Sequence, residues 1–166
     1  MPRKKPHPSH GTPAIVALDR AGVAYGLHPY DHDPASELSY GMEAAAALGA
    51  DPAQVFKTLM ADVDGRFVVG IVPVDGSLDL KALARAVGGK RAAMADPAAA
   101  QRATGYVVGG ISPVGQKHRH PTVLDESARA FDVIYVSGGR RGLDVSLAPD
   151  DLLRLTGGVT APVARA

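Results

Sequence analysis

The chain has 166 residues, of which 46% are hydrophobic, and it carries a formal net charge of +1. This length suits one globular domain, and the small net charge excludes a general basic field that could hold nucleic acid by itself. The absence of cysteine excludes disulfides, thiolate metal ligands and a cysteine nucleophile, and fits a cytoplasmic protein. No apolar run approaches the ~20 residues of a membrane-spanning helix, so we expect no membrane partner.

The first half of the chain predicts helices and strands in alternation. Residues 1–11 are basic and proline-rich, which is typical of a disordered tail. A Thr-Pro pair at 12–13 predicts an N-capped helix that ends at Gly22, and Asp64-Gly65 predicts a hairpin turn. We therefore expect a helix over 12–22, a strand over 23–30, a polar loop over 31–39, a helix over 41–48, strands over 55–62 and 66–74, and a helix over 78–87.

The second half is richer in short apolar runs. We expect a helix over 96–105, strands over 106–108, 122–125, 133–137 and 143–147, a helix over 149–155, and a loose C-terminal tail over 157–166. Because strands are interleaved with helices and one hairpin is present, the pattern predicts a mixed α/β fold. We expect a single domain over 12–156, built on a curved sheet or small barrel with flanking helices.

The segment at 104–117, T-G-Y-V-V-G-G-I-S-P-V-G-Q-K, carries the strongest functional signal. Gly109 and Gly110 lack a Cβ, so a ligand can approach the backbone closely and the chain can take a positive φ. Pro113 fixes its own φ and favours an extended Ser112. The pattern predicts a stiff loop whose N–H groups point at a ligand oxygen. A tight turn between core strands is the alternative, which the glycine content alone does not exclude.

Lys57 is the second signal, because it lies within an apolar strand. Alternation places it on one face with Val55 and Leu59, while Phe56 and Met60 lie on the other. A lysine between apolar neighbours is costly unless its ammonium reaches a partner or a water-lined pocket. We favour a pocket, where the ammonium binds a phosphate or a developing oxyanion. A lysine at a frayed strand end that reaches solvent is the alternative.

Other chemistries receive weaker support. The run Gly110 to Gly115 has one residue too many for a G-x-S-x-G nucleophile elbow, which disfavours a serine hydrolase. The six histidines show no spacing typical of a metal site, so we expect neither metal nor cofactor. Basic residues at 90–91, 117–119 and 140–141 could together line a groove for a nucleic-acid backbone, although a solvated surface is the alternative for each patch.

Several motifs together resemble the YbaK-type aminoacyl-tRNA deacylases. They are Y-D-H-D-P at 30–34, V-F-K-T-L at 55–59, L-D-L-K-A-L-A at 78–84, M-A-D-P at 94–97, the glycine segment at 104–117 and I-Y-V-S-G-G-R-R-G-L-D at 134–144. The resemblance covers nearly all of the chain outside its two tails and is nearest to the bacterial Cys-tRNA(Pro)/Cys-tRNA(Cys) deacylase type. It implies a free-standing editing domain that hydrolyses the ester of mischarged Cys-tRNA(Pro) without a metal or a cofactor.

The resemblance also implies roles for individual residues. Lys57, Gly109 and Gly110 would be catalytic, and Tyr40 stands near the place where the family has an aromatic residue, commonly phenylalanine. The substrate-binding residues would be Tyr30, Tyr40, Ile111, Ser112, Pro113 and Asp144, and we expect Lys117, Arg119, Arg140 and Arg141 to contact tRNA.

The family suggests that the nucleophile comes with the substrate. The thiol of the cysteinyl group would attack its own ester carbonyl and leave as a cyclic thiolactone, while loop N–H groups stabilise the oxyanion. Hydrolysis by water is the alternative and would admit a substrate such as Ala-tRNA(Pro). A non-catalytic module that binds tRNA ends beside a synthetase is a further alternative. Because the net charge is low, a prolyl-tRNA synthetase partner, which the family suggests, could supply tRNA selectivity.

Overall fold

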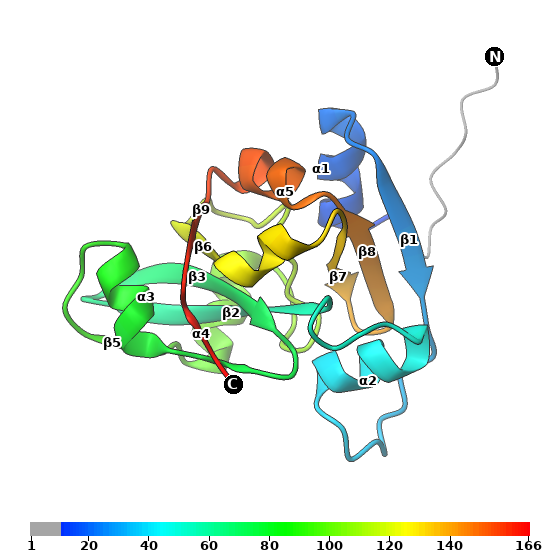
Figure 1. Cartoon of the computed structure of the whole chain (residues 1–166), viewed down its shortest axis with the longest axis horizontal. Helices are drawn as coiled ribbons and strands as arrows, with labels where there is room; N and C mark the ends of the chain where they lie inside the picture. Colours follow the sequence, from blue (N-terminus) through cyan, green and yellow to red (C-terminus); the bar gives the residue numbers. More distant parts are fainter. Residues whose placement is uncertain (1–10) are drawn as a thin grey trace.

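The computed structural model describes residues 11–166, so nearly all of the predicted tail over 1–11 lies outside the described residues. Strands in three sheets lie side by side, with the helices packed around them (Figure 1). No helix in the described range is long and apolar enough to cross a membrane. The helices are α1 Pro13–Ala21, α2 Tyr40–Leu48, α3 Leu80–Ala86, α4 Pro97–Thr104 and α5 Pro149–Thr156, and the strands are β1 Tyr25–Pro29, β2 Phe56–Val63, β3 Arg66–Pro73, β4 Ser77–Leu78, β5 Ala92–Met94, β6 Thr122–Asp125, β7 Ile134–Arg140, β8 Leu143–Leu147, β9 Val159–Ala161 and β10 Ala164–Arg165.

The largest sheet has five strands in the order β5-β2-β3-β6-β9. β2 and β3 form the predicted hairpin, whose turn residues Asp64 and Gly65 both have positive φ. β6 and β9 extend the sheet by parallel pairing. β5 pairs with β2 only at residues 61–63, so the earlier part of β2 keeps an unpaired edge. That free edge becomes one wall of the site described below.

A second sheet contains β1, β8 and β7, all antiparallel. It joins the large sheet through a bridge between Val55 and Tyr135, where the Tyr135 N–H donates to the Gln54 carbonyl at 3.0 Å. An irregularity between Ser137 and Arg140 shifts the register of β7 against β8 just before the hairpin turn. The two sheets therefore meet next to β2.

Capping explains why the helices begin and end where they do. The Thr12 hydroxyl accepts a hydrogen bond from the Ile15 N–H at the start of α1, and Gly22 ends the helix with φ 68°. Asp96 caps α4 in the same way, and Gly105 ends it with φ 82°. Both helices were predicted, the first of them from its cap, and both predictions are confirmed.

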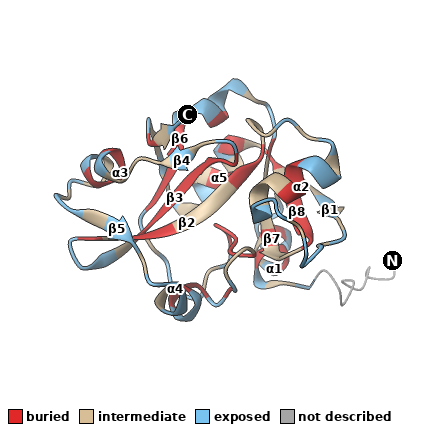
Figure 2. Ribbon diagram, turned by 90° about the horizontal axis from the view of Figure 1, so that it is seen from below, coloured by how far each residue is buried: buried red, intermediate tan, exposed pale blue. Residues whose placement is uncertain are grey.

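Buried residues lie mainly along the strands and on parts of the helices (Figure 2). One cluster connects α1, β7 and β8 and contains Leu18, Ile134 and Val145. A second cluster, with Val68 and Leu83, packs α3 against the five-stranded sheet. The core thus holds the two sheets and their covering helices as one body.

The predicted mixed α/β class is confirmed, and its strands are arranged in three sheets. The predicted strand over 106–108 is wrong, because the backbone N–H groups of Tyr106 and Val108 donate to the side chains of Thr104 and Gln101 and not to another strand. The segment over 157–166 is not a loose tail. It contains β9 and β10, and the buried carboxylate of Asp125 accepts the N–H groups of Val163 and Ala164.

Candidate active site

A cavity of about 320 Å³ lies at the junction of the two sheets. Its wall comes from β2, α2, the start of α4, the segment over 108–111, and residues of β7 and β8. Phe56, Met60 and Ala100 contribute to its largely apolar lining. The volume lies at the small end of the ~300–1,000 Å³ typical of ligand pockets, which suits a small organic group.

Lys57 brings the only ammonium group among the lining residues. Its Nζ makes no hydrogen bond or ion pair within residues 11–166. Burial lowers the pKa of this lysine, and the charge of Asp75 opposes that effect in part. An unpaired ammonium in a partly apolar cavity can bind an anion or a developing negative charge.

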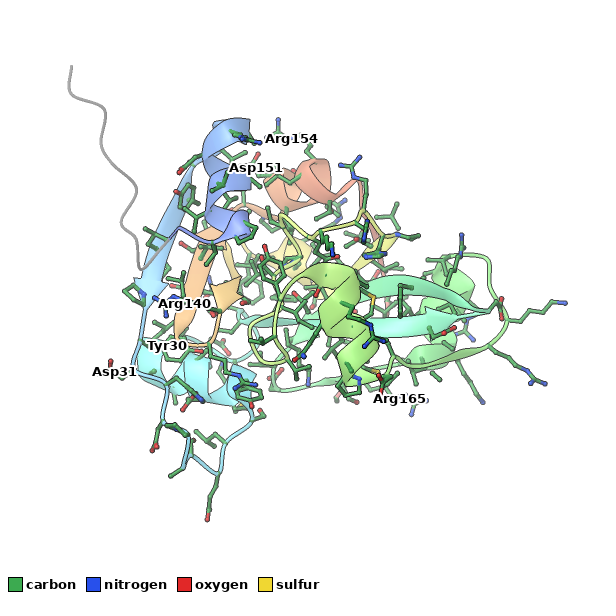
Figure 3. The ribbon with its side chains drawn as sticks, turned by 180° about the vertical axis from the view of Figure 1, so that it is seen from behind. Tyr30, Asp31, Arg140, Asp151, Arg154 and Arg165 are labelled. Carbon is green, nitrogen blue, oxygen red and sulfur yellow. The ribbon has the colours of Figure 1, made fainter. Side chains whose placement is uncertain are left out.

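Asp144, on β8, is the only carboxylate among the lining residues. It is 6% exposed, and burial raises its pKa from 3.8 to about 7. Tyr30 follows β1, and its N–H donates to the Gly142 carbonyl at 2.9 Å. Burial raises the pKa of Tyr30, and the nearby Asp144 raises it further. Tyr30 and Arg140 lie on the same side of the molecule (Figure 3).

The glycine loop, residues 107–115, reaches the cavity at Gly109 and Ile111. Gly109 has φ 86°, and a Cβ at this position would lie 2.7 Å from the Tyr40 ring, so only glycine fits. The N–H of Gly109 has no hydrogen-bond partner in the described part of the chain. The N–H of Gly110 donates to the Val107 carbonyl at 2.9 Å and is therefore used within the turn.

Ser112 and Pro113 do not line this cavity. Ser112 is fully buried, and its hydroxyl accepts the Val114 N–H at 3.2 Å. Pro113 lines a separate hollow together with Arg119. Among the predicted site residues, the structure brings together Lys57, Gly109, Tyr30, Tyr40, Ile111 and Asp144, whereas Gly110, Ser112, Pro113, Lys117, Arg119, Arg140 and Arg141 lie outside the lining of the cavity.

No nucleophile–base pair lines the cavity. The pair formed by His28 and Ser146 is bonded at 2.8 Å, but neither residue belongs to the lining. No histidine is among the lining residues, so none can act as a base for the hydroxyl groups of the cavity. Within residues 11–166, no group of three or more His, Asp or Glu side chains gathers as metal ligands. The cavity therefore offers binding and polarising groups without an activated side-chain nucleophile.

Two polar residues that shape the site, Thr58 and Glu43, were not predicted. The Thr58 hydroxyl is buried at the cavity and has no hydrogen-bond partner. Glu43 accepts His32 Nδ1 at 2.7 Å and the Asp33 N–H at 2.9 Å, which ties the loop before α2 to the helix that carries Tyr40. The hydrogen bond to His32 lowers the pKa of Glu43. Thr58 could have been found as the neighbour of Lys57, but no sequence pattern indicates the Glu43 contacts.

The fold and this cavity define an editing domain. The chain belongs to the aminoacyl-tRNA editing domain family, whose model matches residues 37–155. It is 40% identical over 121 residues to EbsC of Enterococcus faecalis, a candidate Cys-tRNA(Pro)/Cys-tRNA(Cys) deacylase, and the match covers 72% of this chain and 73% of that protein. It is 34% identical to the multifunctional Ser/Thr-tRNA deacylase ProXp-y of Escherichia coli over 60% of this chain and 62% of that one.

A solved structure supports the same family. A crystal structure of a candidate trans-editing enzyme for prolyl-tRNA synthetase superimposes with a TM-score of 0.80 and 27% identity, covering 98% of this chain and 100% of that chain. The predicted family is therefore confirmed, as is the predicted enzyme class, an ester hydrolase, at the level of that family.

Proposed function

We propose that this protein hydrolyses the ester bond of mischarged Cys-tRNA(Pro), with Cys-tRNA(Cys) as a further substrate. One observation carries the proposal: a small apolar cavity holds a single ammonium, a single carboxylate and a free loop N–H. An aminoacyl ester has an α-ammonium that complements the carboxylate, a carbonyl that complements the ammonium and the N–H, and a small side chain that fits the apolar wall. The candidate Cys-tRNA deacylase among the relatives supports the choice of cysteine.

Each polar group has a partner on such a substrate. Asp144 pairs with the α-ammonium, which favours the ionised carboxylate and lowers its pKa on binding. The Gly109 N–H donates to the ester carbonyl and more strongly to the oxyanion that forms from it. Lys57 anchors the carbonyl or the terminal phosphate of the tRNA. The apolar wall, with Phe56 and Met60, contacts the side chain of the amino acid.

The cysteine thiol of the substrate supplies the nucleophile in our proposal. Its sulfur forms a bond to the ester carbonyl carbon as the bond from that carbon to the ribose oxygen breaks. The ribose oxygen takes up the proton that the thiol loses, and the amino acid leaves as a cyclic thiolactone. Holding the two groups in attack geometry can supply effective molarities of ~10⁵–10⁸ M.

Hydrolysis by water is the second candidate mechanism. The relative named as a Ser/Thr-tRNA deacylase favours it, because serine and threonine carry no thiol. Water attack in the same cavity would extend the substrates to small amino acids such as alanine.

Deacylation assays with Cys-tRNA(Pro), Ala-tRNA(Pro) and Pro-tRNA(Pro) test the proposal. We expect the wild type to cleave Cys-tRNA(Pro) fastest and Lys57→Ala to lose about 10²-fold in kcat. Lys81→Ala, at an exposed lysine on α3, is the matched control and should keep the wild-type rate. No cleavage of any substrate would favour a non-catalytic tRNA-end-binding module. Equal rates for Ala-tRNA(Pro) and Cys-tRNA(Pro) would rule out thiol assistance.

A prolyl-tRNA synthetase partner is also part of the proposal, and the structural relative supports it. Adding that synthetase should lower KM for Cys-tRNA(Pro) more than for Cys-tRNA(Cys). An equal effect on both tRNAs would contradict a selective complex.

A further inference from the structure

Arg141 occupies the turn between β7 and β8, just outside the cavity. Its guanidinium donates from Nε at 2.9 Å and from Nη2 at 2.6 Å to one acceptor, the carbonyl oxygen of Val108. Its Cζ lies 4.6 Å from the centre of the Tyr40 ring. The side chain therefore links the β7–β8 turn, the glycine loop and the start of α2.

Val108 is held from both sides. The Gln101 side chain on α4 accepts its N–H at 3.0 Å, while Arg141 binds its carbonyl. The loop here makes no strand ladder, so these side-chain contacts replace the backbone pairing that would otherwise fix its course. Tyr40 completes the arrangement, because its ring lies against both Gly109 and Arg141.

The Val108 carbonyl and the Gly109 N–H belong to the same peptide unit. This peptide is trans, so the carbonyl and the N–H point in opposite directions. Arg141 does not line the cavity, whereas Val108 and Gly109 do. A guanidinium that holds the carbonyl outside the cavity consequently fixes the direction of the N–H within it. The positive charge of the guanidinium beside the carbonyl oxygen also polarises the peptide group and strengthens its N–H as a hydrogen-bond donor.

We propose that Arg141 is a positioning residue that orients the Gly109 N–H toward the ester carbonyl, and that it does not bind a tRNA phosphate. This inference rests on the proposed function, since the N–H serves there as the oxyanion donor. Lysine could replace arginine at a phosphate, but its single ammonium cannot reproduce the planar fork or the stacking on Tyr40.

Arg141→Lys separates the two roles. We expect kcat for Cys-tRNA(Pro) to fall about 10- to 100-fold with KM nearly unchanged, since small misplacements of a catalytic group have effects of this size. A phosphate contact would instead leave kcat intact and alter KM and its dependence on salt. Arg66→Lys is the matched control, because Arg66 donates to the Val87 carbonyl away from the cavity, and it should keep the wild-type kcat.

Chemical rescue sharpens the test. In Arg141→Ala, added guanidinium at millimolar concentration should restore part of kcat, whereas methylammonium of equal charge should not. Equal rescue by both cations would show that only charge is needed and would overturn the proposal.

A measurement on the wild type keeps the inference separate from the proposed function and from the folding of any variant. By NMR, the Arg141 Nε–H should be protected from exchange, and the Gly109 amide resonance should shift in Arg141→Lys. These results are expected even if no aminoacyl-tRNA is cleaved. A freely exchanging Arg141 Nε–H would overturn the positioning role of Arg141. Absence of deacylase activity in the wild type would overturn only the proposed function.

Discussion

At the scale of single residues, the unusual feature is a buried carboxyl group and a half-buried lysine that line the same cavity. Asp144 has little access to solvent, and burial raises its pKa to about 7. The same burial lowers the pKa of Lys57. Both shifts have the direction expected when the charged form is desolvated. The cavity therefore disfavours charge on both groups until a charged ligand enters.

The pKa of Asp144 predicts how stability depends on pH. Because the folded-state value lies above the ordinary 3.8, the folded protein holds this proton more tightly than the unfolded chain. The resulting stabilisation is complete below pH 4 and is lost as the pH rises toward 7. From pH 5 to pH 7 this group should lower the free energy of unfolding by about 2 kcal/mol. Asp144→Asn should remove that decline.

Urea unfolding of both proteins across this pH range provides the measurement. Asp150→Asn, at an exposed carboxylate on α5, is the control and should leave the pH dependence of the wild type unchanged. A decline of the same size in Asp144→Asn and in the wild type would show that another group titrates.

At the scale of elements, the glycine loop is held in place by side chains of α4 and of the β7–β8 turn instead of by a strand ladder. Gly109 and Gly105 allow a matched comparison, since both have positive φ, at 86° and 82°. A Cβ on Gly109 would collide with the Tyr40 ring at 2.7 Å, whereas one on Gly105 would lie an ordinary 3.5 Å from Lys117 Cβ. Gly109→Ala should therefore lower kcat about 10²-fold, since the donor moves.

Gly105→Ala should cost about 1 kcal/mol of stability through backbone strain but should keep the wild-type kcat. Deacylation kinetics and thermal unfolding of the two variants provide the comparison. If both variants lost kcat to the same degree, backbone strain alone would explain the loss, and contact between Gly109 and Tyr40 would be irrelevant.

The elements with strong local signals were predicted correctly, and those without them were not. Caps at Thr12 and Asp96 and the Asp64-Gly65 turn each involve residues close in the sequence. β4, β5, β9 and β10 have only two or three residues, too few for a periodic pattern. The apolar run at 106–108 has the composition of a strand, but its amide groups are bound by side chains of α4.

Among the residues of the candidate site, likewise, only those that a local motif indicates could be predicted. The apolar strand pattern indicated Lys57, and the resemblance indicated Tyr30 and Asp144. The cavity brings these three together from β2, the residue after β1, and β8. The contact between Arg141 and Val108 spans 33 residues and depends on how the two loops meet. No local pattern could distinguish this half-buried contact from a solvated basic turn, so the sequence alone placed Arg141 with the tRNA-binding residues.

At the scale of the whole molecule, the cavity lies where the five-stranded and three-stranded sheets join at Val55 and Tyr135. A ligand in this cavity contacts β2 of the five-stranded sheet, β7 and β8 of the three-stranded sheet, and the glycine loop. Substrate binding therefore requires the assembled fold, because no single element forms the site.

Net charge at this scale leads to the last prediction. The chain carries only +1, and Arg141 holds the glycine loop, so we expect local residues such as Lys117 and Arg119 to attract tRNA. Each phosphate contact adds about 0.9 to the slope of log affinity against log salt concentration. The double variant Lys117→Ala/Arg119→Ala should therefore reduce the slope of log KM by about 2, with kcat unchanged. The paired change Lys81→Ala/Arg85→Ala on α3 removes equal charge and should leave the slope as in the wild type. Equal slopes in both double variants would mean that the protein attracts tRNA through its overall charge, or that other basic residues make the phosphate contacts.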